Sequence, residues 1–206
     1  MDKRIAIINL GVGNINSVFN SVERLNKKPY LISSGKELTE FHPTHVIMPG
    51  VGAVGQAIKY IKEKQFDTAL NYLIKEKECF FCGICLGMHI LSEKCEEFGN
   101  FQGLGWIPGK VTRLNSEGLS LPHMGWNNIN LKNKNNKFLK ELDGIDMFFA
   151  HSYAMDCPKE YIEATSEYGS EFAVIVRLKN IIGIQCHPEK SSLGGKIFLE
   201  NFINLE

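Results

Sequence analysis

The feature that most constrains this fold is a short apolar strand that must turn into a helix around one cysteine. Residues 79–84 form a nearly continuous apolar run, which is typical of a strand buried on both faces. From Leu86 onward the apolar residues follow helical spacing. Cys85 stands between the two elements, with Gly83 and Gly87 two positions away on either side. This pattern indicates a nucleophile elbow, because strand and helix approach closely there and the reactive side chain sits in a strained backbone conformation.

Cys85 is a candidate nucleophile because a thiol at a helix N-terminus has a lowered pKa, so that the attacking thiolate is populated. Cys79, Cys82 and Cys85 also have the spacing of iron–sulfur ligands, and the last two have that of a redox pair. Both alternatives are weak, since the fourth ligand and its following proline are absent and residues three apart in a strand point to opposite faces. We interpret Cys79, Cys82, Cys95 and Cys157 as buried apolar residues.

Composition argues against several classes of protein. The chain has 206 residues, 44% of them hydrophobic, and its 23 basic and 23 acidic residues give a formal net charge of zero. This length suits one domain over residues 1–206, and the balanced charge makes no electrostatic case for nucleic acid. Six scattered cysteines are no disulfide framework and favour a reducing, cytoplasmic location. No apolar stretch approaches the length of a membrane span, so we expect no membrane association.

The order of predicted elements indicates an α/β fold class, with a mostly parallel sheet flanked by helices and additional antiparallel strands in the second half. In the first half, strands are predicted over 4–9, 30–32 and 45–48, with a helix running from the Gly11–Asn14 turn to about Leu25. In the second half they are predicted over 110–114, 128–131, 147–150, 161–166, 172–178 and 181–186, the last two joined by a tight hairpin, with a helical turn over 138–142 and a closing helix after Ser192.

A glycine-rich loop over residues 50–55 reads G-x-G-x-x-G between a strand and a helix, which by itself suggests a nucleotide site. No acidic residue follows the next strand to hold a ribose hydroxyl, so a different role fits better. In a parallel sheet this loop can aim backbone N–H groups at the space above Cys85. We therefore predict an oxyanion hole made by Val51 and Gly52, together with the N–H of Leu86.

A second group of candidate residues lies near the C-terminus. His187 and Glu189 are two positions apart, so in an extended segment they face the same way. This suits a base and its orienting carboxylate: His187 takes the proton of Cys85, and Glu189 holds the imidazole. The other histidines considered, His42, His45, His123 and His151, are interpreted as loop or packing residues.

Five segments together resemble the class I glutamine amidotransferases. They read Pro-Gly-Val-Gly-Ala at 49–53, Gly-Ile-Cys-Leu-Gly-Met at 83–88, Pro-His-Met-Gly-Trp-Asn at 122–127, His-Ser-Tyr at 151–153 and His-Pro-Glu-Lys-Ser at 187–191. The resemblance runs in order over almost the whole chain. Within the class, the segments at 49–52 and 122–127 resemble the glutaminase subunits that supply ammonia in histidine biosynthesis.

The resemblance implies a flavodoxin-like fold and a catalytic triad of Cys85, His187 and Glu189 that hydrolyses glutamine through a glutamyl thioester. It implies a (β/α)8-barrel cyclase subunit as partner in a heterodimer, to which ammonia is channelled, and neither a cofactor nor a metal. By the same resemblance, Gly52, His89, Ser152 and Tyr153 contact the substrate, and Asn14, Trp126 and Lys190 lie at the partner interface.

The chain departs from the family pattern at three positions. His89 stands where the family usually has Gln, and Cys186 and Val54 stand where aromatic residues are common. These departures leave the triad intact and keep other readings open. One is a related glutaminase that supplies a different acceptor, such as an enzyme of amino- or amidino-sugar synthesis. The others are a non-catalytic regulatory partner of a synthase and a thiol protease or other hydrolase built on the same elbow.

Overall fold

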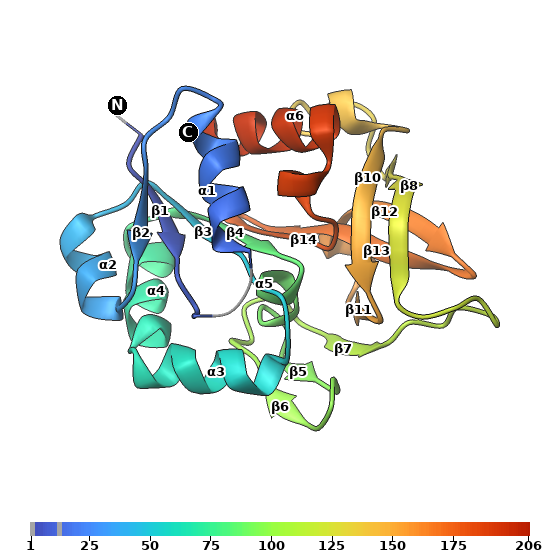
Figure 1. Cartoon of the computed structure of the whole chain (residues 1–206), viewed down its shortest axis with the longest axis horizontal. Helices are drawn as coiled ribbons and strands as arrows, with labels where there is room; N and C mark the ends of the chain where they lie inside the picture. The colour runs from blue at the N-terminus through green and yellow to red at the C-terminus, as the bar shows by residue number, and fades with distance from the viewer. Residues whose placement is uncertain (1–2, 12–13) are drawn as a thin grey trace.

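The computed structural model describes residues 3–11 and 14–206, and its centre is an eight-stranded sheet (Figure 1). The first five strands in sheet order run parallel, and the last three are antiparallel. The predicted α/β class is confirmed by this arrangement. In sheet order the strands are β2 (Pro29–Ile32), β1 (Ile5–Ile8), β3 (His45–Met48), β4 (Phe80–Ile84), β14 (Ile181–Ile184), β13 (Ser170–Leu178), β12 (Ile162–Tyr168) and β9 (Asn130–Leu131).

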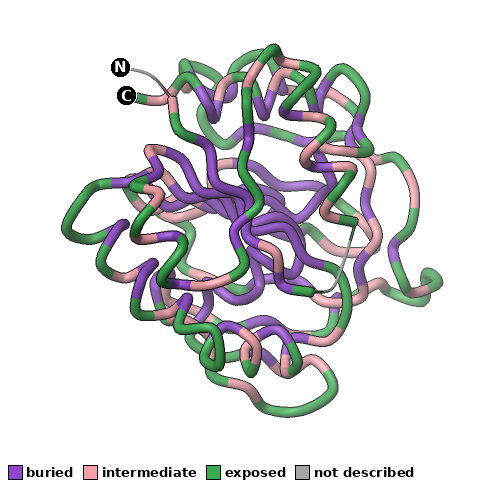
Figure 2. Tube along the Cα trace, turned by 60° about the vertical axis from the view of Figure 1, so that its left-hand side comes forward, coloured by how far each residue is buried: buried purple, intermediate pink, exposed green. Residues whose placement is uncertain are grey.

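Helices cover both faces of this sheet (Figure 1). α1 (Ile15–Glu23) and α6 (Ser192–Ile203) pack on one face, and α2 (Gly35–Phe41), α3 (Val54–Glu63) and α4 (Phe66–Lys75) pack on the other. In β1 the side chains alternate between the two: Ile5 and Ile7 lie on the α1 face, Ala6 and Ile8 on the opposite face. The buried parts of the chain therefore converge on the strands (Figure 2), which explains their continuous apolar sequence.

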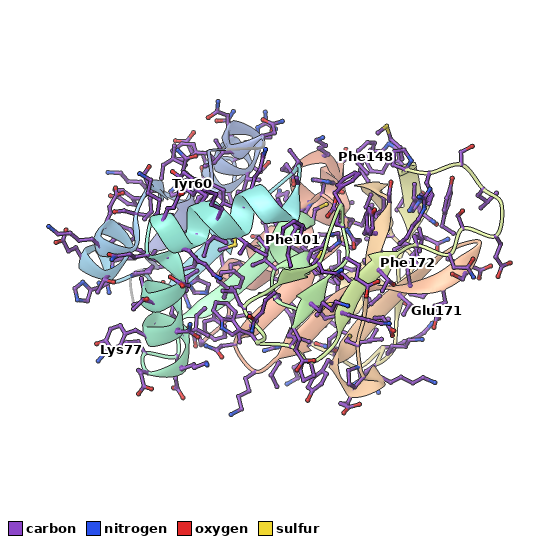
Figure 3. All side chains as sticks on the ribbon, turned by 90° about the horizontal axis from the view of Figure 1, so that it is seen from below. Tyr60, Lys77, Phe101, Phe148, Glu171 and Phe172 are labelled. Carbon is purple, nitrogen blue, oxygen red and sulfur yellow. The ribbon has the colours of Figure 1, made fainter. Side chains whose placement is uncertain are left out.

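Two small sheets complete the second half of the chain. In one, β8 (His123–Asn128) pairs with β10 (Asp146–His151). In the other, the strands in order are β11 (Tyr153–Asp156), β7 (Lys110–Arg113), β5 (Lys94–Cys95) and β6 (Phe101–Gln102). Phe101 of this sheet reaches the first turn of α3, where its ring lies against Gly55 (Figure 3). The second sheet is thereby anchored to the helical layer.

Most of the predicted elements are present, with differences where the local pattern was weak. The strand predicted over 128–131 is wrong in place, since 123–128 form β8 and only 130–131 form β9. β8 contains a glycine and apolar residues that face outward, so its sequence does not show the alternation of apolar and polar residues typical of a strand. It forms a strand because it pairs with β10. The sequence did not predict α2 and α4.

Of the predicted turn at 11–14, Val12 and Gly13 lie outside the described residues, and Asn14 caps α1 by accepting from the Ser17 N–H at 3.4 Å. Short 3₁₀ turns are η1 (Lys140–Leu142), η2 (Lys159–Tyr161) and η3 (Pro188–Lys190).

The predicted elbow is confirmed. Cys85 has φ 53° and ψ −105° between β4 and the one-turn helix α5 (Leu86–His89). A Cβ added at Gly83 would lie 2.3 Å from the Gly87 carbonyl oxygen, and one added at Gly87 would lie 2.1 Å from the Met48 carbonyl oxygen. Both positions require glycine, because a neighbouring main-chain carbonyl occupies the space that any other side chain would need. The helix is shorter than predicted, so its dipole contributes less to the thiol than a long helix would.

Across residues 3–11 and 14–206, no helix combines the length and apolar character needed to cross a bilayer.

Replacing Gly87 by alanine should destabilise the fold by about 3 kcal/mol, because the new methyl group meets the immovable Met48 carbonyl. The measurement is the free energy of unfolding in urea. Gly144→Ala is the matched control: Gly144 has φ 75° with open space around it, so the substitution costs only the backbone strain, about 1 kcal/mol. Equal losses in the two variants would show that close packing of the elbow is not what requires glycine at 87.

Candidate active site

The candidate site is a pocket of about 280 Å³ at the carboxyl ends of the parallel strands. This is the edge at which open α/β sheets usually bind ligands. Cys85, which is 7% exposed, lies in its wall. The other lining residues come from three regions: the glycine-rich loop, the elbow with the segment after it, and the β8–β10–β11 corner. They are Val51, Gly52, Ala53, Leu86, His89, Glu97, Phe98, Pro122, Ala150, His151, Ser152 and Tyr153.

His187 is brought to Cys85 by the pairing of β4 with β14. Ile84 lies opposite Ile184 in parallel register, and the Cys85 N–H donates to the Ile184 carbonyl at 2.7 Å. His187 follows, with its N–H donating to the Phe148 carbonyl at 2.8 Å. Both predicted groups are therefore at one edge of the sheet, although they are far apart in the chain.

Glu189 contacts His187 as predicted, with 2.8 Å between its Oε1 and Nδ1 of the imidazole. The expected extended segment is wrong in detail, because Pro188–Lys190 is a 3₁₀ turn. The proline starts this turn, which folds the carboxylate back onto the ring. With Nδ1 donating to Glu189, the other ring nitrogen, Nε2, is the one left for the thiol.

The Nε2 atom of His187 is buried and has no partner of regular hydrogen-bond geometry among the described residues. It nevertheless lies close enough to the Cys85 sulfur for the two groups to shift each other's pKa. Catalytic hydrogen bonds are often long before a substrate binds and tighten in the complex, so this arrangement suits proton transfer between Cys85 and His187.

The electrostatics favour a thiolate–imidazolium pair. Burial disfavours the imidazolium, but interactions with Cys85 and Glu189 outweigh it and raise the pKa of His187 to about 10. Burial also disfavours the thiolate, yet the hydrogen bond with His187 and the charges of His187 and His89 lower the pKa of Cys85. These opposite shifts favour the charged pair, with the proton on the imidazole, over a neutral thiol beside a neutral imidazole.

The remaining cysteines lack such partners. Burial raises the pKa of Cys79 to about 12 and, as the main cause, the pKa values of Cys95 and Cys157 to about 11. The pKa of Cys82 is raised as well, by burial and by the charge of Glu189. All six thiols are free. The interpretation of Cys79, Cys82 and Cys95 as buried residues is confirmed, whereas Cys157 is half-buried.

The predicted oxyanion-hole residues line the same pocket as the thiol, but one of their N–H groups already has a hydrogen-bond acceptor. Val51, Gly52 and Leu86 all line the pocket. The N–H of Leu86 donates to the Gly50 carbonyl at 3.3 Å, so it is not free for an oxyanion in this arrangement. The space beside Gly52 is open, because a Cβ added there would meet no atom within 4 Å.

The predicted substrate residues Gly52, His89, Ser152 and Tyr153 all lie in the pocket wall. His89 is 3% exposed and bonds to Gln185. Two polar residues were missed by the sequence reasoning. Glu97 lines the pocket without any motif to mark it. Gln185 stands next to the His187 segment, where its position directly after an apolar strand was the only signal.

Of the histidines interpreted as loop or packing residues, His42, His45 and His123 lie in such places, whereas His151 also lines the pocket. His45 is buried against Phe80, and His42 is an exposed residue that ends α2. His123 stacks between Phe149 and Tyr168, with ring centroids at 4.9 and 4.1 Å. His151 bonds to His123 at 3.1 Å, and burial is the main reason its pKa falls to about 3.

The residues expected at a partner interface lie near one another on the surface. Trp126 is 53% exposed, and its ring centroid lies 6.1 Å from that of Phe148. The ammonium of Lys190 lies 5.6 Å from the same Phe148 ring. Asn14 begins α1, which packs against η3, the turn that carries Lys190. These residues and the pocket share the same end of the sheet.

Among the described residues, no three His, Cys, Asp or Glu side chains are grouped as a metal site.

Comparison with known proteins places the chain in a family. The family model for glutamine amidotransferase class I matches residues 6–205. The chain is 37% identical to the imidazole glycerol phosphate synthase subunit HisH 2 of Vibrio vulnificus, covering 98% of this chain and 94% of that protein. It is also 37% identical to the subunit HisH of Helicobacter hepaticus, with 98% of each chain covered.

Solved structures agree on the fold. A crystal structure of a glutamine amidotransferase matches with a TM-score of 0.75 at 17% identity, over 96% of this chain and 98% of the other. The structure of PurLQS from Thermotoga maritima gives the same TM-score and identity, over 99% of both chains. With its elbow, its pocket and this similarity over nearly its whole length, the chain belongs to the class I glutamine amidotransferases.

Proposed function

We propose that this protein is the glutaminase subunit of an imidazole glycerol phosphate synthase and acts in histidine biosynthesis in the cytoplasm. The observation that carries the proposal is that Cys85, in the pocket wall, interacts with His187, whose Nδ1 lies 2.8 Å from Oε1 of Glu189. Its support from relatives is the similarity of nearly the whole chain to HisH subunits of that synthase. The unit responsible is one amidotransferase domain over residues 1–206.

The proposed reaction begins with attack of the Cys85 thiolate on the side-chain amide carbon of glutamine. The carbonyl electron pair moves to oxygen, and backbone N–H groups of the Val51–Gly52 loop and Leu86 stabilise this oxyanion. When the tetrahedral intermediate collapses, the C–N bond breaks and His187 gives its proton to the departing nitrogen, which leaves as ammonia. The glutamyl thioester on Cys85 remains.

Hydrolysis of the thioester uses the same groups in reverse. His187, now neutral, takes a proton from water as the water oxygen attacks the thioester carbon. The C–S bond breaks, glutamate leaves, and the proton returned to His187 restores the ion pair with Cys85. Glu189 stabilises the imidazolium each time it forms. Because the Leu86 N–H is held by the Gly50 carbonyl, we expect slow turnover in the isolated chain and faster turnover when a partner moves this loop.

The proposed partner is a (β/α)8-barrel cyclase subunit, seated where Asn14, Trp126 and Lys190 surround the pocket end of the sheet. A half-exposed tryptophan beside a lysine is typical of an interface centre, since aromatic residues contribute most to protein–protein affinity. Ammonia formed at Cys85 would pass directly into the covering subunit.

A second candidate is a related glutaminase that serves a different acceptor enzyme. His89 favours it, because this residue replaces a glutamine usual at the substrate pocket. The two candidates share the chemistry at Cys85 and differ only in the protein that receives ammonia. Co-purification with a barrel cyclase from the native organism separates them, and recovery of another synthase would favour the second candidate.

Replacing Cys85 by alanine should abolish glutamine-dependent synthesis by the complex while leaving synthesis from added ammonium salts unchanged. The reason is that the thiol acts only in releasing ammonia. Both rates are measured on the reconstituted complex. Loss of both activities would mean that the chain does more than deliver nitrogen.

Glu189→Gln should lower the pKa of His187 from about 10, because the carboxylate is one of the groups that raise it. In the wild type, thioester formation should therefore decline as the pH rises through about 10, when His187 loses the proton needed by the leaving ammonia. In the variant this decline should begin at lower pH, with a fall of about a hundredfold in the rate at neutral pH. An alkaline limb at the same pH in both proteins would contradict the role assigned to Glu189.

Trp126→Ala should weaken binding of the cyclase subunit about thirtyfold, as expected for truncation of an aromatic residue central to an interface. The measurement is the dissociation constant by calorimetry. Tyr72→Ala is the matched control, because Tyr72 is similarly exposed at 45% but lies on α4, on the opposite face of the sheet. Equal effects of the two variants would place the interface elsewhere.

A further inference from the structure

Gln185 is a buried amide whose two ends contact two residues of the site. It directly follows β14 and is 0% exposed. Its Nε2 donates to the Cys85 sulfur at 3.7 Å, and its Oε1 lies 2.9 Å from Nε2 of His89. An amide buried without hydrogen bonds costs several kcal/mol. These two contacts are the only side-chain hydrogen bonds of Gln185 among the described residues.

The charge on the sulfur determines which way these hydrogen bonds run. A thiolate can only accept, so the amide N–H group must face Cys85 and the amide oxygen must face His89. His89 therefore donates through Nε2. Its other nitrogen, Nδ1, lies 3.7 Å from Oε2 of Glu97, which is an ion-pair distance and favours a proton there too. His89 with both nitrogens protonated is a cation beside the thiolate.

The electrostatics agree with this geometry. Burial disfavours the charged imidazole, but Glu97, Cys85 and Gln185 outweigh it and raise the pKa of His89. The charge of His89 in turn contributes to the lowered pKa of Cys85. Two chains of polar contacts thus lead away from the sulfur. One runs through His187 to Glu189, and the other runs through Gln185 and His89 to Glu97.

We propose that Gln185, oriented by His89, is a positioning residue that holds the Cys85 thiolate independently of His187. The inference rests on the proposed function only in taking Cys85 as the nucleophile. His89 acts in two ways, since it fixes the orientation of the Gln185 amide and adds a positive charge. This gives His89 a role toward the thiolate in addition to any contact with glutamine.

The other titratable groups near the sulfur add no positive charge to it. The carboxylate of Glu189 raises the pKa of Cys85, in the opposite direction from His89. His151 lines the pocket, and its pKa of about 3, lowered chiefly by burial, keeps it neutral. The thiols of Cys82 and Cys186 are kept neutral by pKa values raised mainly by burial. Within residues 3–11 and 14–206, His187 and His89 are therefore the groups whose positive charge lowers the pKa of Cys85.

The test is the rate at which iodoacetamide alkylates Cys85 across a range of pH, with the adduct measured by peptide mass spectrometry. This reagent is small and neutral, and only the thiolate reacts, so the midpoint of the profile reports the thiol pKa. Gln185→Met keeps the volume and removes the donor. We expect its midpoint at higher pH and a rate at pH 7 reduced about fivefold. At high pH its rate should equal or slightly exceed that of the wild type.

Two substitutions of His89 separate orientation from charge. His89→Gln retains a donor for the Gln185 oxygen and removes only the charge, so we expect a smaller shift than in Gln185→Met. His89→Leu removes both and should give the larger shift. His45→Gln is the matched control, because His45 is equally buried but lies at the amino end of β3, away from the pocket. Its profile should equal that of the wild type.

Overlapping profiles of Gln185→Met and the wild type would overturn the proposal. A lower rate at every pH without a shift of the midpoint would also overturn it, because that indicates general damage to the elbow. If Gln185→Met does not fold, the two His89 variants decide by the same criterion. A wild-type Cys85 with no thiolate-dependent alkylation would instead count against the proposed function itself.

Discussion

The site depends on the parallel register between β4 and β14. Ile84 lies beside Ile184, and the Cys85 N–H bonds to the Ile184 carbonyl, so the chain leaves both strands at the same level of the sheet. A shift of one residue would turn the side chains that follow β14 to the other face, because strand side chains alternate. Apolar packing on both faces specifies this register, since each strand has buried residues above and below the sheet.

The register matters because it brings opposite charges together in a place where either alone would be costly. Cys82 and Cys85 show the difference. Both thiols are buried. Burial and the charge of Glu189 raise the pKa of Cys82, whereas His187 and His89 lower the pKa of Cys85 in spite of its burial. The strained elbow points the Cys85 sulfur toward the pocket, where imidazoles compensate the charge that the core would exclude. The reactivity of Cys85, alone among the six cysteines of the chain, thus follows from the imidazoles beside it.

Much of this arrangement was predictable from the sequence. The bounds of β3 and the place of the elbow agree with the structure, because each depends on residues close together in the chain. Pairing of His187 with Glu189 was also predicted, although a 3₁₀ turn produces it where an extended segment was expected. The predictions failed where packing overrode the local pattern. Residues 123–127 lie outside the strand predicted over 128–131 but belong to β8, since β10 offers them a partner strand.

What the sequence by itself determined was the elbow, because Gly83 must leave room for the carbonyl of Gly87, only four residues further along the chain. What only the tertiary structure decided was the set of contacts between distant segments. Gln185 meets Cys85 and His89 across about a hundred positions, Glu97 reaches the pocket without a motif, and the Leu86 N–H is held by Gly50. These contacts depend on strand order and side-chain direction, which short-range sequence patterns do not encode.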